Sequence, residues 1–95
     1  MAAFKLARRA RVDLVELAQH TAAEWGAERA RAYVGRLYGA FELLARHPRM
    51  GTRIDGGFRR YRMPTASHVI YYRVRAASVL IVRVLHKRML PSAHL

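Results

Sequence analysis

The chain has 95 residues, with 18 lysine and arginine against 6 aspartate and glutamate, a formal net charge of +12 and 53% hydrophobic residues. This length fits a single domain over residues 1–95 and excludes a two-domain enzyme. The apolar content excludes a disordered chain. No cysteine is present, which excludes disulfides, a thiolate nucleophile and a cysteine-based zinc site.

The basic residues are concentrated in the second half of the chain. Residues 1–42 hold seven basic and five acidic side chains, a net charge of +2, whereas residues 43–95 hold eleven basic side chains and only Asp55, a net charge of +10. A surface of this charge attracts phosphate or an acidic protein. No apolar stretch reaches the length of a signal peptide or a membrane span, and we therefore expect a soluble, cytoplasmic protein.

The first half of the chain has the pattern of two helices. Phe4 to Leu6 could add an edge strand before them. Apolar residues then recur three and four positions apart within 8–25 and again within 27–45, which predicts two amphipathic helices that break at Gly26 and end before Pro48. A break this short predicts an antiparallel hairpin. The two predicted buried stripes are Ala10, Leu14, Leu17, Thr21 and Trp25, and Ala30, Tyr33, Leu37, Phe41 and Leu44.

The second half has the pattern of strands. After a glycine-rich loop at 51–57, the segments 58–63, 68–75 and 79–86 are short runs rich in valine, isoleucine and tyrosine. The connections between them are short enough for hairpin turns. The order of elements predicts an α+β fold in which the antiparallel two-helix hairpin packs on one face of a three- to four-stranded antiparallel sheet, with the N-terminal strand at its edge.

A helical hairpin covers only one face of a sheet, so the other face should be a partner site if it is apolar. Strict alternation along the last two predicted strands places one apolar set on this second face. An exposed patch of this size usually marks an interaction surface. The alternative is that the tail from Lys87 to Leu95 folds back over it. The set consists of Val69, Tyr71, Val79, Ile81 and Leu85.

No cofactor or metal site is indicated by the sequence. The five histidines lack the close spacing of a helical ligand motif and have no acidic cluster beside them. Neither a dinucleotide-binding nor a phosphate-loop sequence is present. Metal-free RNA cleavage is the one reaction that the composition permits, because it needs an acid, a base and cations around the phosphate. The groups available for it are Arg62, His68, Arg83 and His86, with Lys87 and Arg88 nearby.

Nucleic-acid binding without catalysis is a further possibility. Single strands are bound by basic groups and exposed aromatic rings, and Tyr61, Tyr71 and Tyr72 lie among several arginines. Tyrosines at alternate strand positions are also ordinary sheet packing.

An ordered set of short motifs along the whole chain resembles the ParE branch of the RelE/ParE toxin superfamily. None of the motifs is specific alone, but their order is. They are Ala10-x-x-Asp13-Leu14, Trp25-Gly26, Tyr33 with Leu37, Leu44-Ala45-x-x-Pro48-x-x-Gly51, Tyr61-Arg62, the strand from His68 to Arg73, and Val84-Leu85-His86-x-Arg88-Met89 followed by His94-Leu95.

The resemblance implies the toxin of a bacterial type II toxin–antitoxin pair, associated with plasmid stabilisation and neutralised by a cognate ParD-like antitoxin in a hetero-oligomer. ParE-like toxins are described as poisons of DNA gyrase, whereas RelE-like relatives cut messenger RNA on the ribosome. RelE-type nucleases usually carry a tyrosine near the end of the last strand, where this chain has His86-Lys87-Arg88-Met89. This departure favours a gyrase inhibitor over an endoribonuclease.

The expected contacts follow from charge and apolar surface. An acidic and apolar antitoxin segment would bind the second sheet face, with charge mainly accelerating the encounter. A gyrase–DNA complex offers acidic and phosphate surfaces to a cationic patch. We expect target contacts from the basic strand ends and the tail, namely Arg60, Arg62, His86, Lys87 and Arg88.

Overall fold

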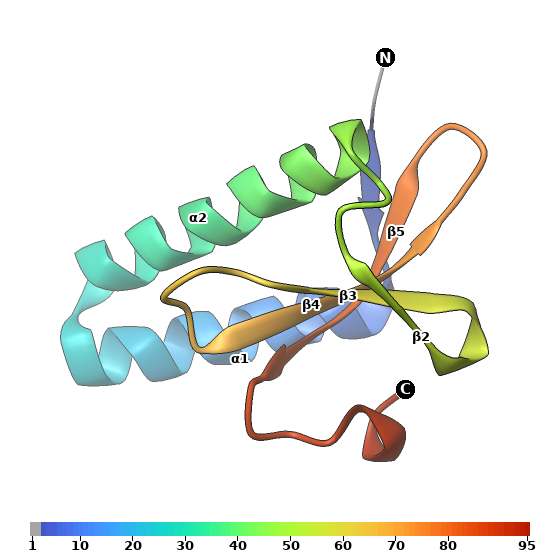
Figure 1. Ribbon diagram of the computed structural model, residues 1–95. Coiled ribbons are helices and arrows are strands. Elements are labelled where there is room, and N and C mark those ends of the chain that lie inside the picture. The colour runs from blue at the N-terminus through green and yellow to red at the C-terminus, as the bar shows by residue number, and fades with distance from the viewer. Residues whose placement is uncertain (1–2) are drawn as a thin grey trace.

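The computed structural model describes residues 3–95 (Figure 1). The N-terminal strand β1 is followed by two helices and then by four further strands. Their bounds are β1 Phe4–Leu6, α1 Arg8–Trp25, α2 Ala27–Arg46, β2 Thr52–Ile54, β3 Phe58–Arg62, β4 His68–Val74 and β5 Val79–His86, with short 3₁₀ turns at Asp55–Gly57 and Pro91–Ala93. The predicted α+β architecture and both helices are confirmed.

The five strands form one mixed sheet in the order β1-β5-β4-β3-β2. β2 to β5 pair antiparallel as a meander, and β1 pairs in parallel with the first part of β5. The sheet has one strand more than the sequence indicated, because β2 lies within the segment that we assigned to a loop. β2 has only three residues and an edge position, so it carries little of the apolar alternation that identifies a strand.

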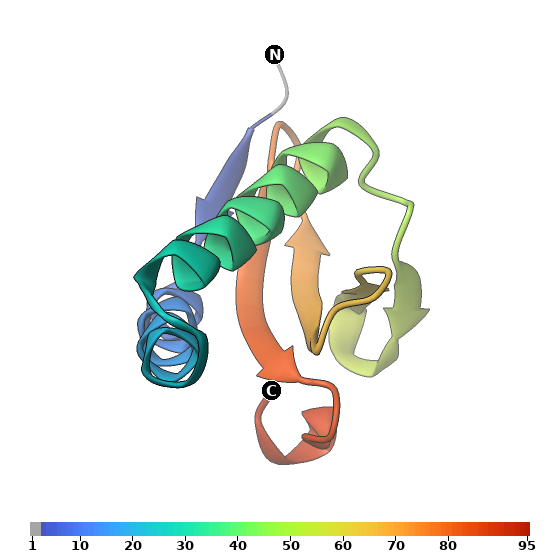
Figure 2. The same cartoon turned by 90° about the vertical axis from the view of Figure 1, so that its left-hand side faces the viewer.

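Both helices cover the same face of the sheet (Figures 1 and 2). Gly26 separates them with φ of 92°, a conformation that favours glycine, and its amide donates to the carbonyl of Ala22 at 2.9 Å. The predicted stripes are largely correct, because most of their residues are buried between the helices and the sheet. The exception is Trp25, whose side chain is 61% exposed at the end of α1.

A β-bulge changes the facing of residues along β5. The register slips between Tyr71 and Tyr72, so that Tyr71 lies opposite Arg83 but Tyr72 lies opposite Ile81, and one β5 residue is left over between them. Alternation therefore restarts part-way along the strand. Ile81 and Val84, an odd and an even position, both point into the core beneath the helices.

The loop after α2 is closed over the sheet by a buried tyrosine. The Tyr72 hydroxyl donates to the carbonyl of Pro48 at 2.7 Å and accepts from the amide of Gly51 at 2.9 Å. A Cβ added at Gly51 would lie only 2.5 Å from this hydroxyl and 2.7 Å from the Arg60 carbonyl oxygen. Glycine is therefore required there by close packing.

Within residues 3–95 no helix combines the length and apolar character needed to span a membrane.

Candidate functional site

Several of the predicted functional residues meet at one end of the sheet. β3 ends there at Arg62, β4 begins at His68 and β5 ends at His86. His68 and His86 are direct cross-strand partners, and their ring centroids are 5.5 Å apart. The amide of Lys87 extends the pairing by donating to the carbonyl of Ser67 at 2.8 Å. Lys87 and Arg88 are exposed beyond the strand end.

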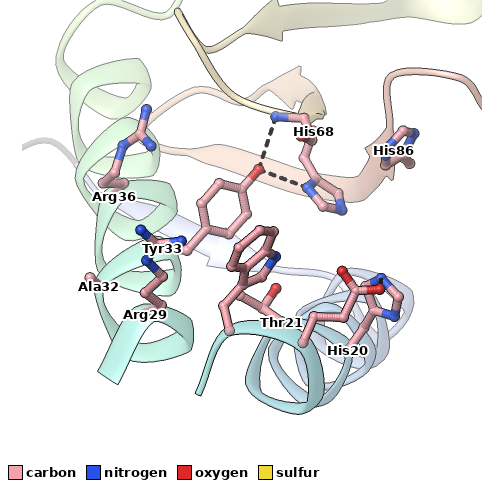
Figure 3. A pocket seen from close by; sticks show the side chains of 11 residues that line it. His20, Thr21, Arg29, Ala32, Tyr33, Arg36, His68 and His86 are labelled. Atoms are coloured by element: carbon pink, nitrogen blue, oxygen red, sulfur yellow. Dashed lines mark hydrogen bonds and ion pairs between the residues drawn. The ribbon is translucent and has the colours of Figure 1, made fainter. Parts of the chain in front are cut away.

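His68 is held as an uncharged ring at neutral pH. The Tyr33 hydroxyl accepts a hydrogen bond from the Ser67 amide at 3.2 Å and lies 2.7 Å from His68 Nδ1 (Figure 3). In a neutral imidazole one ring nitrogen carries the proton and the other accepts, so Nδ1 accepts from the hydroxyl in one tautomer and donates to it in the other. Burial, and secondarily the nearby His86, lowers the pKa of His68 from 6.5 to about 4.

A hollow of about 480 Å³ opens beside this histidine, between the turn of the helical hairpin and the end of the sheet. Figure 3 shows Tyr33, His68, His86 and His20 around it, with Arg29 and Arg36 along one wall. The guanidinium of Arg36 lies 5.8 Å from the centroid of the Tyr33 ring. The complete lining is His20, Thr21, Glu24, Trp25, Arg29, Ala32, Tyr33, Arg36, Ser67, His68 and His86.

The sheet face away from the helices, hereafter the outer face, combines arginines with apolar side chains. Arg60 pairs with Tyr71, and Tyr71 in turn with Arg83. Directly paired residues project on the same face of a sheet. In the next row Arg62 pairs with Val69. Val69, Tyr71 and Leu85 form a small cluster separate from the main core, with Ile54 packed against it.

The prediction of one bare apolar face is wrong in two respects. Val79 and Ile81 belong to the main core beneath the helices, because the bulge and the pairing with β1 turn them to that side. Val69, Tyr71 and Leu85 do lie on the outer face, but each is 2% to 3% exposed. These five residues therefore offer no exposed apolar surface to a partner. The exposed apolar side chains nearby are Val12 and Val15 of α1 and Met89, Leu90 and Leu95 of the tail.

An ion pair joins α1 to β5, and its arginine also contacts the tail. The Asp13 carboxylate accepts from Arg83 Nε at 2.8 Å, from Arg83 Nη2 at 2.9 Å and from the Val84 amide at 2.9 Å. β1 pairs with β5 only as far as Ile81, so Asp13 supplies an acceptor at the β5 edge beyond it. Arg83 Nη1 donates to the carbonyl of His94 at 2.8 Å, which brings the tail back toward β5.

The alternative ribonuclease residues are only partly assembled. His68 and His86 lie together on the helix-covered side of the sheet end, whereas Arg62 and Arg83 lie on the outer face. Arg83 is already engaged by Asp13, whose hydrogen bonds raise the pKa of the guanidinium further. Among residues 3–95 no group of three or more histidine and acidic side chains is placed to hold a metal ion.

Comparisons with known proteins assign the chain to a family. A family model described as the ParE toxin of the type II toxin-antitoxin system parDE matches residues 4–91. The chain belongs to the ParE toxin family. It is 39% identical over 98 aligned positions to Toxin ParE1 of Caulobacter vibrioides, covering 100% of this chain and 99% of that relative. The predicted membership of the ParE branch, and with it a type II toxin, is confirmed.

The fold of this toxin is shared with a solved structure. The chromosomal ParDE toxin–antitoxin system from P. aeruginosa contains a chain that superposes with a TM-score of 0.79 at 21% sequence identity. The superposition covers 90% of this chain and 96% of that one. The ParE arrangement of two helices on a sheet is therefore retained at low sequence identity.

Sequence reasoning missed two features of this ParE site. The pair of Asp13 with Arg83 spans 70 positions. Its only signals were a lone arginine within the apolar segment 79–85 and an acid beside a buried helix stripe, a position that Glu16 shares. The hollow at Tyr33 and His68 was missed because Tyr33 was assigned to a buried helix stripe and His68 was considered only as an alternative ribonuclease residue. Its one visible signal was Trp25, a large aromatic side chain at the last position before a helix break.

Proposed function

We propose that this ParE toxin inhibits DNA gyrase by protein–protein contact in the bacterial cytoplasm and is neutralised by a cognate ParD-like antitoxin. The observation that carries the proposal is the cationic outer face and sheet end of a chain in the ParE family. Arg60 is half-buried on that face, and Arg62, Lys87 and Arg88 are exposed at its end. Gyrase bound to DNA presents acidic and phosphate groups, which pair well with arginine.

The target contact is assigned to these four residues and the adjoining tail. His86 is a weaker member of the predicted set, because its ring faces the helix side beside His68 rather than the outer face. Its Nδ1 accepts a hydrogen bond from the Arg88 amide at 3.2 Å, so His86 positions the basic turn that follows. Substitution of Arg62 or Arg88 should therefore reduce toxicity more than substitution of His86.

The antitoxin contact is assigned to the exposed apolar side chains beside α1 and in the tail. Two hollows share Asp13, Glu16 and Arg83 along the seam between α1 and β5. One of them is lined by Val12 of α1, and the other extends to Met89 and His94 of the tail. Leu90 is 70% exposed in the same tail. An apolar antitoxin segment that covers this tail would also cover the basic residues after β5. Neutralisation would then follow from direct occlusion of the target surface.

Expression in a bacterium with a DNA-damage reporter tests the proposal. Induction of the reporter and accumulation of cleaved plasmid, both suppressed by the neighbouring antitoxin, are expected. Cleaved messenger RNA without DNA damage would instead identify a ribosome-dependent endoribonuclease. Growth arrest with neither signal would exclude both targets and leave a basic nucleic-acid-binding module.

Variants distinguish the surface that contacts the target from the surface that binds the antitoxin. Truncation before Lys87 should abolish growth arrest. Arg62→Ala with Arg88→Ala should reduce arrest while the chain still binds the antitoxin. Arg53→Ala is the matched control, because Arg53 is exposed on the edge strand β2, away from β5. Equal loss of toxicity in the control would show that net charge alone is responsible.

A further inference from the structure

The hollow between the helical hairpin and the sheet end contains an aromatic side chain that packing does not explain. Trp25 is the only tryptophan of the chain and lies on the stripe that should be buried. Its side chain is nevertheless 61% exposed and lines this hollow. Exposed aromatic rings beside basic groups are the usual platform for stacking a nucleobase.

Two arginines are held against the aromatic walls of the hollow. The Arg29 guanidinium lies 5.0 Å from the centroid of the Trp25 ring. The Arg36 guanidinium lies 5.8 Å from that of Tyr33, and its Nη2 also donates to the carbonyl of Pro64 at 3.1 Å, which leaves its other nitrogens for a ligand. The acidic member of the lining, Glu24, already lies 3.5 Å from His20. The hollow therefore has a surplus of positive charge on arginines, which recognise phosphate in a bidentate manner.

An uncharged imidazole, that of His68, completes the lining. Tyr33 engages Nδ1 of His68, which leaves Nε2 for a ligand, as a donor in one tautomer and as an acceptor in the other. The low pKa of His68 keeps this ring neutral at physiological pH. An uncharged imidazole nitrogen suits the polar edge of a nucleobase, which carries both donors and acceptors, and the arginines suit its phosphate.

We propose that this hollow binds one nucleotide, with the base against Trp25 and Tyr33 and the phosphate at Arg29 and Arg36. A volume of about 480 Å³ is within the range of small-ligand sites. Apart from His86, which also positions the basic turn, the lining residues are separate from the outer face and from the residues to which target contact is assigned. Two sources of the ligand share this chemistry, a free mononucleotide and the 5′-phosphorylated end of a single strand.

The position of Trp25 makes its intrinsic fluorescence a direct reporter. The full chain is titrated with AMP, with adenosine, with inorganic phosphate and with a 5′-phosphorylated adenine tetranucleotide, with excitation at the red edge of indole absorption. AMP is expected to change the emission saturably, and both adenosine and phosphate to bind at least tenfold more weakly. Tighter binding of the tetranucleotide than of AMP would identify the strand end as the ligand, and equal or weaker binding the free nucleotide.

Variants locate the site. Arg29→Gln with Arg36→Gln should weaken AMP binding at least tenfold, whereas Arg31→Gln should leave it unchanged, because Arg31 is exposed on the same helix but does not line the hollow. Thermal unfolding of each variant verifies that it is folded. A response to AMP and the tetranucleotide that never saturates, or equal binding by the double variant, would overturn the proposal. Gyrase inhibition is scored separately, so failure of one proposal is distinguishable from failure of the other.

Discussion

The pair of Asp13 with Arg83 should be the most costly polar contact to break in this fold. The two side chains are only 9% and 12% exposed. Asp13→Ala removes three hydrogen bonds, leaves the Val84 amide without its acceptor and leaves a nearly buried guanidinium with one carbonyl partner. Removal of one member of a buried pair costs about 3–5 kcal/mol, against a total stability of about 5–15 kcal/mol for a domain.

A double variant separates the interaction energy between Asp13 and Arg83 from the effects of the single substitutions. In Asp13→Ala with Arg83→Met no charge is left unpaired, so its free energy of unfolding should exceed that of Asp13→Ala alone. The coupling energy from the cycle should be about 2 kcal/mol or more, near the upper end for contacting residues. Urea unfolding measures the free energy of unfolding of each variant, provided that the slope of this free energy with urea concentration is the same in all of them.

A control is available in the same helix. His20 and Glu24 lie 3.5 Å apart but are 74% and 55% exposed. Glu24→Ala should change the free energy of unfolding by no more than about 0.5 kcal/mol. A cost below about 1 kcal/mol for Asp13→Ala, or simple additivity in the cycle, would refute the assigned role of this pair.

Three further predictions concern the loop, the histidine and the tail. Gly51→Ala should lower the free energy of unfolding by about 1–3 kcal/mol, because its Cβ would displace the Tyr72 hydroxyl. Gly39→Ala, which has open space around it, should raise the free energy of unfolding by about 0.5–1 kcal/mol. Similar effects of the two substitutions would contradict the close packing at Gly51. Since the pKa of His68 falls from 6.5 to about 4 on folding, the unfolded state binds the extra proton between these values, so stability should decrease as pH falls from about 6.5 to about 4. His68→Gln should lose that part of the pH dependence in urea unfolding, and an unchanged profile would show that the ring is not buried as described. Leu90→Asp should weaken antitoxin binding at least tenfold in titration calorimetry, with little loss of stability, whereas Val74→Asp at the opposite end of the sheet should not; equal effects would place the antitoxin elsewhere.

The elements of this fold were predictable because they depend on local sequence patterns. α1 and α2 follow from apolar spacing and from the break at Gly26, where positive φ favours glycine. β3, β4 and β5 follow from their runs of apolar and β-branched residues. The parallel pairing of β1 with β5 joins residues that are far apart in sequence, and no local pattern encodes it.

The candidate site was less predictable because one irregularity changes the facing of a whole strand. Strict alternation placed Val79, Ile81 and Leu85 on one face, whereas the bulge opposite Tyr71 and Tyr72 separates Leu85 from the other two. An isoleucine-to-aspartate substitution at Ile81, fully buried, would therefore test core packing rather than partner binding. The roles of Asp13 and Trp25 depend on tertiary neighbours and became visible only with the fold.

Purified gyrase, plasmid DNA and the full toxin chain provide the most direct test of the proposed function. With ATP present, the toxin should cause gyrase-dependent accumulation of linear plasmid after detergent and protease treatment. Arg62→Ala with Arg88→Ala should reduce this linear product, and Arg53→Ala should not. Absence of linear plasmid at a toxin concentration that arrests growth in cells would contradict gyrase as the target.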